Sequence, residues 1–283
     1  MNNYRPAMGL TPAVKAILII NVLIFLFVNF MGSRGGTDYV RVLGLHLPQS
    51  DYFHWYQYFT HMFTHEGLSH MFFNMFAVFM FGRILESVWG TKRFVFYYLV
   101  TGLGAAVLHS LVSWYGYYHV QEQFVAFQNA PDPGLLAEFI RSQYGSINVG
   151  VPVANATYAI DAQKFIDAWL ADPNMSGAAD VANDMYRGVM RQMLNVTTIG
   201  ASGAVFGILL AFGMLFPNTE LFLMFIPIPI KAKYFVILYG AVELFLGLQN
   251  SAGDNVAHFA HLGGMLFGFF LILYWRKHSR RFY

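Results

Sequence analysis

The sequence contains no cysteine, and only 11% of its 283 residues are charged. The first absence excludes disulfide bonds, thiol catalysis and zinc sites built from cysteine. The second excludes a soluble domain of this length, which needs much more charge to cover its surface. The net charge of +2 is small, and no basic stripe with interleaved aromatic residues indicates a nucleic-acid partner. With 57% of its residues hydrophobic, the chain has the composition of an integral membrane protein.

Six apolar segments each approach the roughly 20 residues that a helix needs to cross a bilayer. They comprise residues 14–31, 68–85, 94–114, 202–216, 234–248 and 257–275, the fourth being short and ending at Pro217. The first run is long and lacks a clear small-residue cleavage site, so we expect it to be retained as a span. The sequence therefore predicts an all-α membrane protein with a bundle of six transmembrane helices.

A stretch of different composition, residues 115–195, separates the third and fourth segments. It holds most of the acidic residues and contains turn-forming runs such as Pro131-Asp132-Pro133-Gly134. Within it, residues 159–170 have the pattern of an amphipathic helix. The stretch is too long for a simple connection, so we expect an inserted subdomain or lid. The chain then divides into residues 1–114 with three helices, the insertion 115–195, and residues 196–283 with three helices and a basic tail.

Basic residues predict the orientation, because cytoplasmic loops of membrane proteins carry an excess of lysine and arginine. With the N-terminus inside, eleven basic residues fall inside and six outside. The eleven are Arg5, Lys15, Arg83, Lys92, Arg93, Lys231, Lys233, Arg276, Lys277, Arg280 and Arg281. We therefore expect both termini in the cytoplasm of a bacterial cell, with the protein in its inner membrane and the insertion outside. This orientation puts the N-terminal ends of the fourth and sixth helices on the same side.

Two apolar helices carry residues able to act as a nucleophile and its base. Ser202 lies in Gly200-Ala201-Ser202-Gly203 at the start of the fourth segment, and His261 lies near the start of the sixth. A serine hydroxyl is a weak nucleophile and needs a base within hydrogen-bond reach. Small residues such as Gly203 and Gly264 let two helices approach closely in lipid. No carboxylate is obviously placed to orient His261, so the sequence favours a Ser–His dyad over a triad.

The second apolar segment supplies candidate hydrogen-bond donors. His70 and Asn74 are four residues apart, so they share one helical face. Donors aimed at a developing oxyanion are each worth about two to three powers of ten in the rate of acyl transfer. The backbone N–H of Ser202 is a further candidate, because the first turn of a helix has free N–H groups and the positive end of its dipole.

Other polar residues in apolar surroundings have simpler explanations. His61, His65 and His70 lack the spacing of a His-Glu-x-x-His metal motif, and only Glu66 offers a nearby carboxylate. We therefore expect no metal ion and no cofactor, with His61 and His65 holding a loop at the membrane surface by hydrogen bonds. Glu243, in the fifth segment, is an intramembrane acid for which we expect an interhelical hydrogen bond or exposure near the outer rim.

Together these motifs resemble those of the rhomboid family of intramembrane serine proteases. The resemblance is carried by the run from His65 to Asn74, by Gly200-Ala201-Ser202-Gly203, and by Ala260-His261-Leu262-Gly263-Gly264 with Gly268. It covers residues 12–114 and 196–275. It implies a six-helix fold whose fourth helix begins inside the bilayer, at the bottom of a water-filled cavity.

The resemblance also implies roles for individual residues. Ser202 is implied as the nucleophile and His261 as the base, with His70, Asn74 and backbone N–H groups binding the oxyanion. Phe206, one turn after the serine, stands where the family has an aromatic ring that packs on the catalytic histidine.

Three features qualify the comparison. His258 lies one turn before His261 and is the rival base, although His261 has the family's spacing to the following glycines. Tyr56-Gln57 stands where many members have a Trp-Arg pair in the first loop. The resemblance does not cover the insertion 115–195, which faces the active-site side and could cap the cavity or select substrates.

The expected function is hydrolysis of peptide bonds in or beside transmembrane helices of membrane-protein substrates, at small residues where a helix unwinds easily. The expected partners are those substrates and the lipid bilayer. The alternative is a non-catalytic rhomboid-like protein that binds membrane helices, although such relatives typically lack the serine or the histidine. A transporter is a third possibility, against which the spans show no obvious inverted repeat.

Overall fold

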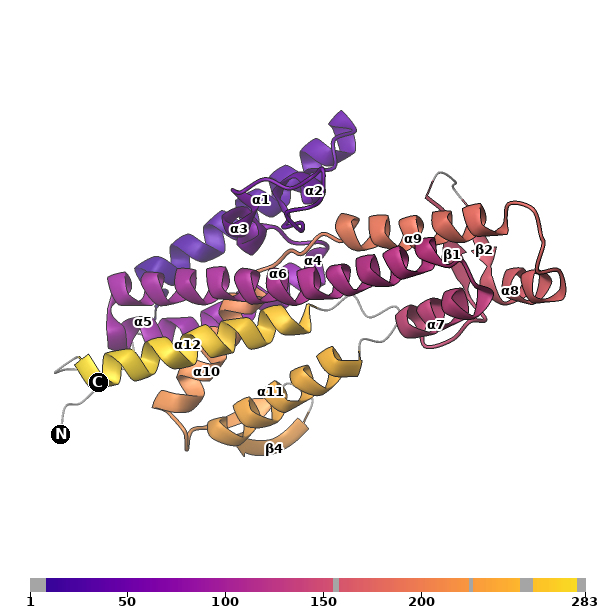
Figure 1. Ribbon diagram of the computed structural model, residues 1–283. Helices are drawn as coiled ribbons and strands as arrows, with labels where there is room; N and C mark the ends of the chain where they lie inside the picture. The colour runs from indigo at the N-terminus through magenta and orange to yellow at the C-terminus, as the bar shows by residue number, and fades with distance from the viewer. Residues whose placement is uncertain (1–8, 155–157, 224–225, 250–256, 279–283) are drawn as a thin grey trace.

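A computed structural model of the chain describes residues 9–154, 158–223, 226–249 and 257–278, and helix dominates it (Figure 1). Five helical stretches are long and apolar enough to cross a membrane, namely Pro12–Gly32, Leu68–Trp89, Thr91–Asn129, Ala232–Gln249 and His258–His278. A further apolar helix, Ser202–Leu215, is shorter. The prediction of a helical membrane protein is thus confirmed in the described part of the chain.

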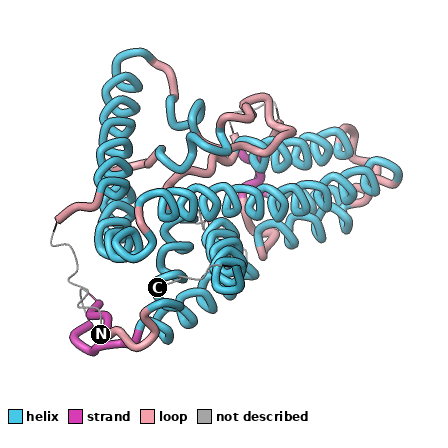
Figure 2. The backbone as a smooth tube through the Cα atoms, turned by 90° about the vertical axis from the view of Figure 1, so that its left-hand side faces the viewer, coloured by secondary structure: helices cyan, strands magenta, loops and turns pink. Residues whose placement is uncertain are grey.

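The elements follow one another along the chain as helices with two short hairpins. The first group is α1 (Pro12–Gly35), α2 (Tyr39–Leu43), α3 (Gln57–Thr60), the 3-10 turn η1 (His61–Phe63), α4 (Leu68–Ala77), the π-helical segment η2 (Val78–Gly82), α5 (Arg83–Trp89) and α6 (Thr91–Asn129). The second is α7 (Pro133–Tyr144), β1 (Gly150–Pro152), β2 (Ala159–Asp161), α8 (Ala162–Ala171) and α9 (Ala178–Asn195). The third is α10 (Ser202–Leu215), β3 (Glu220–Leu223), β4 (Ile226–Lys231), α11 (Ala232–Gln249) and α12 (His258–His278). Both hairpins are antiparallel and small beside the helices (Figure 2).

Helix α6 is longer than the apolar run that predicts it. The run ends at Trp114, whereas the helix continues to Asn129, just before the Pro131-Asp132-Pro133-Gly134 turn. No proline interrupts the added part, and Val120 and Phe127 on it are buried. The boundary expected at residue 115 therefore falls inside a continuous helix, which passes from one packed cluster into another.

Two separate hydrophobic clusters hold the structure together. The first joins α1, the α4–α5 helix, the beginning of α6, α10 and α12. The second joins the end of α6 to α7, β1, α8 and α9, and it centres on Tyr186, whose ring stacks on Phe139 with centroids 3.8 Å apart. Part of the amphipathic pattern at 159–170 is helical: α8 begins at Ala162 because the Asp161 side chain caps it, accepting from Lys164 N.

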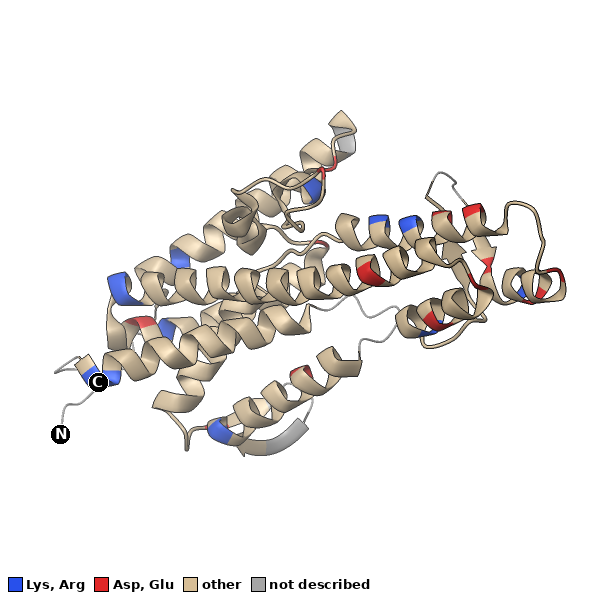
Figure 3. Ribbon diagram, viewed as in Figure 1, with Lys and Arg blue, Asp and Glu red and all other residues tan. Residues whose placement is uncertain are grey.

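The start of α1, the α5–α6 corner and the end of α12 lie at one end of the molecule. The backbone N–H groups of Ala13 and Val14 both donate to the Glu86 carboxylate at 2.9 Å. At the same corner the rings of Trp89 and Trp275 lie 5.4 Å apart. Basic residues gather towards this end, whereas most acidic residues lie towards the other (Figure 3). Arg5, Arg280 and Arg281 lie outside the described residues.

Candidate active site

The closest packing in the site is between α10 and α12, where two glycines face each other. A Cβ at Gly264 would lie 2.7 Å from the carbonyl carbon of Gly203 and would overlap its oxygen. A Cβ at Gly203 would in turn lie 3.4 Å from the Ala260 carbonyl oxygen. The prediction that small residues bring these two helices into contact is therefore confirmed.

An aromatic stack links the serine helix to the histidine helix. The rings of Phe206 and His261 are parallel within 6°, with centroids 4.1 Å apart. Ser202, the first residue of α10, lies four residues before Phe206 and so shares its helical face. No hydrogen bond joins the Ser202 hydroxyl to the His261 ring in the described structure, as is common before a substrate binds.

The loop that enters α10 brings His70 next to the serine. Gly200 has φ +111°, and a Cβ there would lie 2.7 Å from His70 Nε2 and 3.8 Å from Ser202 Oγ. The imidazole and the hydroxyl therefore both lie close to a position that only glycine can occupy without strain. Asn74, also buried, donates its amide nitrogen to the His70 carbonyl at 3.0 Å, within its own helix.

Two buried histidines of the first loop bind the segment of chain that precedes Ser202. The Gly200 N–H donates to the His61 carbonyl at 2.9 Å, and the Ala201 N–H donates to His65 Nε2 at 3.4 Å. His61 Nδ1 is itself 2.9 Å from the Gln57 carbonyl. Burial lowers the pKa of His61 to about 4, and burial followed by the nearby His70 lowers the pKa of His65 to about 3. The expected loop-holding role of His61 and His65 is confirmed, with both rings neutral at pH 7.

Gln57, at the place where the first loop departs from the family's Trp-Arg pair, organises that loop. Its side chain is fully buried. Its Oε1 accepts from the backbone N–H groups of His46 and His54, at 3.4 and 3.2 Å. Its Nε2 donates to the carbonyls of Val42 and Tyr52, at 3.2 and 2.8 Å. One amide thus joins three stretches of the loop, a role that the sequence alone did not indicate.

The expectation that no carboxylate orients His261 is wrong. Glu243 Oε2 lies 2.8 Å from His261 Nδ1 and 2.7 Å from His258 Nδ1, with all three side chains buried. The residue comes from α11, a neighbour of α10 and α12 that buries few of its side chains. A sequence signal was available, because Glu243 shares a helical face with the small residues Gly240 and Gly247.

Glu243, His258 and His261 also form a group whose ligand atoms lie within 4.8 Å of one another. The ligand atoms of a tetrahedral zinc ion lie about 2.0–2.1 Å from it, and so about 3.3 Å from each other. The separations here, 2.7 and 2.8 Å, are those of charge-assisted hydrogen bonds instead. The geometry therefore fits a carboxylate shared by two imidazoles better than a metal centre.

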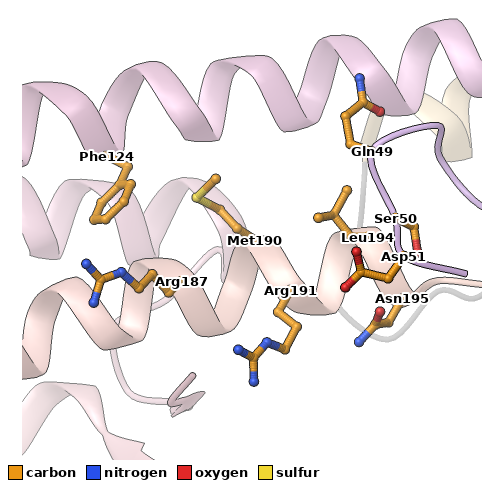
Figure 4. A pocket seen from close by; sticks show the side chains of 9 residues that line it. All are labelled: Gln49, Ser50, Asp51, Phe124, Arg187, Met190, Arg191, Leu194 and Asn195. Atoms are coloured by element: carbon orange, nitrogen blue, oxygen red, sulfur yellow. The ribbon is translucent and has the colours of Figure 1, made fainter. Parts of the chain in front are cut away.

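Two of the cavities among the described residues bear on this part of the molecule. One of about 560 Å³ borders His258 and is walled by α6, α11 and α12. Another, of about 250 Å³, lies between the first loop and α9, and Arg187, Arg191 and Asp51 line it (Figure 4). Only the first adjoins the buried Glu243 and histidine group, where it offers room for water.

Several known proteins with rhomboid names are similar in sequence to this chain. An uncharacterized mitochondrial rhomboid protein of Schizosaccharomyces pombe is 27% identical over 80% of this chain and 53% of its own length. Rhomboid-like protein 11 of Arabidopsis thaliana, named as chloroplastic, is 34% identical over 35% of the chain and 31% of its own. The Bacillus subtilis protein YdcA, whose name proposes a rhomboid protease, is 27% identical over 36% of the chain and 50% of its own.

The chain thus spans about half the length, or less, of the curated relatives it matches. Two of them carry organellar names, so the relatives do not favour a bacterial inner membrane in particular. The Rhomboid domain model matches residues 52–122 and 166–278, more than half of the chain. The matched residues include the end of the first loop, the helix of His70 and the helices of the serine and the histidine. The chain belongs to the rhomboid family.

Proposed function

We propose that this protein is an intramembrane serine endopeptidase that uses Ser202 as nucleophile and His261 as base. One observation carries the proposal: the Phe206 ring stacks on His261 at 4.1 Å, with Ser202 one turn before it on the same face of α10. That arrangement supports a pairing of the hydroxyl with the imidazole across the α10–α12 contact. A relative that only bound membrane helices would have no need of this pairing.

The proposed reaction has two stages. Ser202 Oγ attacks the scissile carbonyl carbon, forming a C–O bond while its proton passes to His261 Nε2. The imidazolium then protonates the leaving amine as the C–N bond breaks, which leaves an acyl-enzyme. Water, deprotonated by the same imidazole, attacks the ester, and the proton returns to Ser202 Oγ as the new carboxylic acid departs.

His70, Asn74 and the Ser202 N–H are the proposed donors to the oxyanion. The proximity of His70 Nε2 and Ser202 Oγ to Gly200 supports His70 most directly. The Ser202 N–H belongs to the first turn of α10, where no intrahelical acceptor is available. The Asn74 amide donates one of its hydrogens to the His70 carbonyl and retains a second for the reaction centre.

The proposed substrates are the transmembrane helices of other membrane proteins, cleaved at small residues where the helix unwinds. The gathering of basic residues at one end of the bundle supports an orientation with both termini in the cytoplasm (Figure 3). Ser202 and His258 each begin a helix, which supports a reaction centre nearer the opposite face. The second cluster, with residues 133–195, would then lie outside the membrane at the active-site side.

Replacing the two residues separately tests the proposal. Purified Ser202→Ala and His261→Ala proteins should fail to cleave a fluorescent single-span peptide with an Ala-Gly-rich centre, whereas His258→Ala should still cleave it. A fluorophosphonate probe should label Ser202 in the unsubstituted protein. Cleavage by Ser202→Ala at the original rate would refute the proposal. No labelling and no cleavage would favour the alternative, a non-catalytic protein that binds membrane helices.

A further inference from the structure

Glu243 is the ionisable residue of α11 that turns away from lipid. Most side chains of that helix are exposed, among them Ile237, Leu238 and Phe245, while Glu243 is only 4% exposed. A carboxylate removed from water needs compensating hydrogen bonds, and an acid inside a membrane usually marks function. Among the described residues the compensation comes from α12, through two histidine side chains.

The hydrogen bonds define the state of the His261 ring. An ionised carboxylate can only accept, so the nitrogen facing Glu243 Oε2, Nδ1, carries the proton. The neutral ring then has its lone pair on Nε2, the nitrogen that must take the proton of Ser202. The second bond, from His258 Nδ1 to the same oxygen at 2.7 Å, holds the carboxylate in place.

We infer that Glu243 is a positioning residue that converts the Ser202–His261 pair into a Ser–His–Glu relay, holding the His261 tautomer and stabilising the imidazolium. Glu243 takes no proton in this scheme: its negative charge stays opposite the positive ring while Nε2 gains and returns the proton of Ser202. His258 acts on the carboxylate and not on the serine. The inference rests on the proposed hydrolysis and goes beyond it by assigning the third member.

Titratable groups surround His261 on several helices, and a pH profile must be read against all of them. They are Glu243 and Tyr239 on α11, His258 on α12, His70 on α4 and His109 on α6. Among the described residues, only Glu243 places a carboxylate on the ring, so its loss removes a stabilising partner from the imidazolium.

The test compares Glu243→Gln with Glu86→Gln, a matched variant of another buried glutamate. Glu86 binds Ala13 N and Val14 N at the start of α1, in a structural role. Glu243→Gln should lower kcat by about 10²–10⁴-fold, as loss of the orienting carboxylate does in a serine protease triad, with KM little changed. It should also move the acid limb of the kcat/KM profile to lower pH and slow fluorophosphonate labelling of Ser202. Glu243→Asp should recover part of the activity.

Glu86→Gln should lower the melting temperature in detergent without moving the acid limb. The inference is overturned if Glu243→Gln keeps kcat within about twofold and the acid limb stays in place while Ser202→Ala is inactive. It is also overturned if kcat falls only as far as the loss of folded protein accounts for, with an unmoved acid limb. If Ser202→Ala remains active or the probe labels nothing, the proposed function fails instead, and that outcome is visible before Glu243 is tested.

Discussion

The contact between Gly264 and Gly203 offers a way to move the reacting groups without touching either. In Gly264→Ala the new methyl group would lie 2.7 Å from the Gly203 carbonyl carbon and would overlap its oxygen. Both obstacles are backbone atoms, so the two helices must part by about 1 Å to make room. A helix gains about 0.5–1 kcal/mol when alanine replaces glycine, but overpacking of this kind costs about 1–3 kcal/mol or more. We therefore expect a net loss of stability.

In Gly264→Ala, the increase in the activation free energy of cleavage should exceed the loss in the free energy of unfolding. A misplacement of about 1 Å in an active site can cost about 10²-fold in rate. Gly240→Ala is the matched control. Its methyl group would lie 3.0 Å from Cε of Met265, which is part of a flexible side chain and not of the backbone. Cleavage of the single-span peptide and the melting temperature in detergent are measured for both variants. If Gly264→Ala cleaves as fast as the unsubstituted protein, the helices do not set the distance between serine and histidine, and this reasoning is refuted.

Three further outcomes are expected. Phe206→Leu removes the ring stacked on the imidazole of His261, the proposed base, and since such a stack is worth about 0.5–1.5 kcal/mol, cleavage should slow by about threefold to tenfold with unchanged labelling specificity. His61 has a pKa of about 4 when folded and the ordinary value when unfolded, so the unfolded chain binds the proton first as pH falls. Stability should therefore decline by up to about 3 kcal/mol between about pH 6.5 and 4, and His61→Gln should flatten this part of the melting curve against pH. Because the chain has no cysteine, Asn174→Cys and Lys277→Cys each carry one thiol, and in intact cells an impermeant maleimide should label only the former; labelling of the latter alone would reverse the proposed orientation.

The sequence predicts the membrane helices well because their signal is local. Apart from the end of α6, apolar runs of sufficient length identify the five long spans and the short α10 within a few residues, and Pro217 follows the end of α10. The end of α6 is missed because hydropathy falls after Trp114, although nothing there breaks the helix. Its continuation is stabilised by packing in the second cluster, which depends on partners such as Tyr186 that are distant in sequence.

In the candidate site, too, the sequence predicts features with a local signal and misses those that depend on residues distant in sequence. Glycines beside Ser202 and His261 predict that the two helices touch, because close approach in lipid needs small residues wherever they occur. For Glu243 the sequence predicts either a bond between helices or exposure near the outer rim, and it does not identify a partner, since pairing α11 with α12 depends on how the two helices are rotated. Nothing in the sequence indicates the hydrogen bonds of Gln57, because all four are to backbone groups, which every residue type offers equally.

Hydrolysis in a membrane makes two opposed demands, since water and charge must reach the reacting bond while the surrounding helices must pack without polar gaps. In this chain the two demands are met by different residues of the same two helices. Ser202, His258 and His261 occupy the first turns of α10 and α12, and His258 borders the cavity of about 560 Å³. Gly203 directly follows Ser202, and Gly264 lies about one turn after His261, where the two backbones meet directly. Substitutions of the polar residues should therefore act on proton transfer and its pH dependence. Substitutions at the contact between Gly203 and Gly264 should act only on the distance between the serine and the histidine. A variant of the glycine contact that moved the acid limb of the rate profile would show that the two functions are not separable.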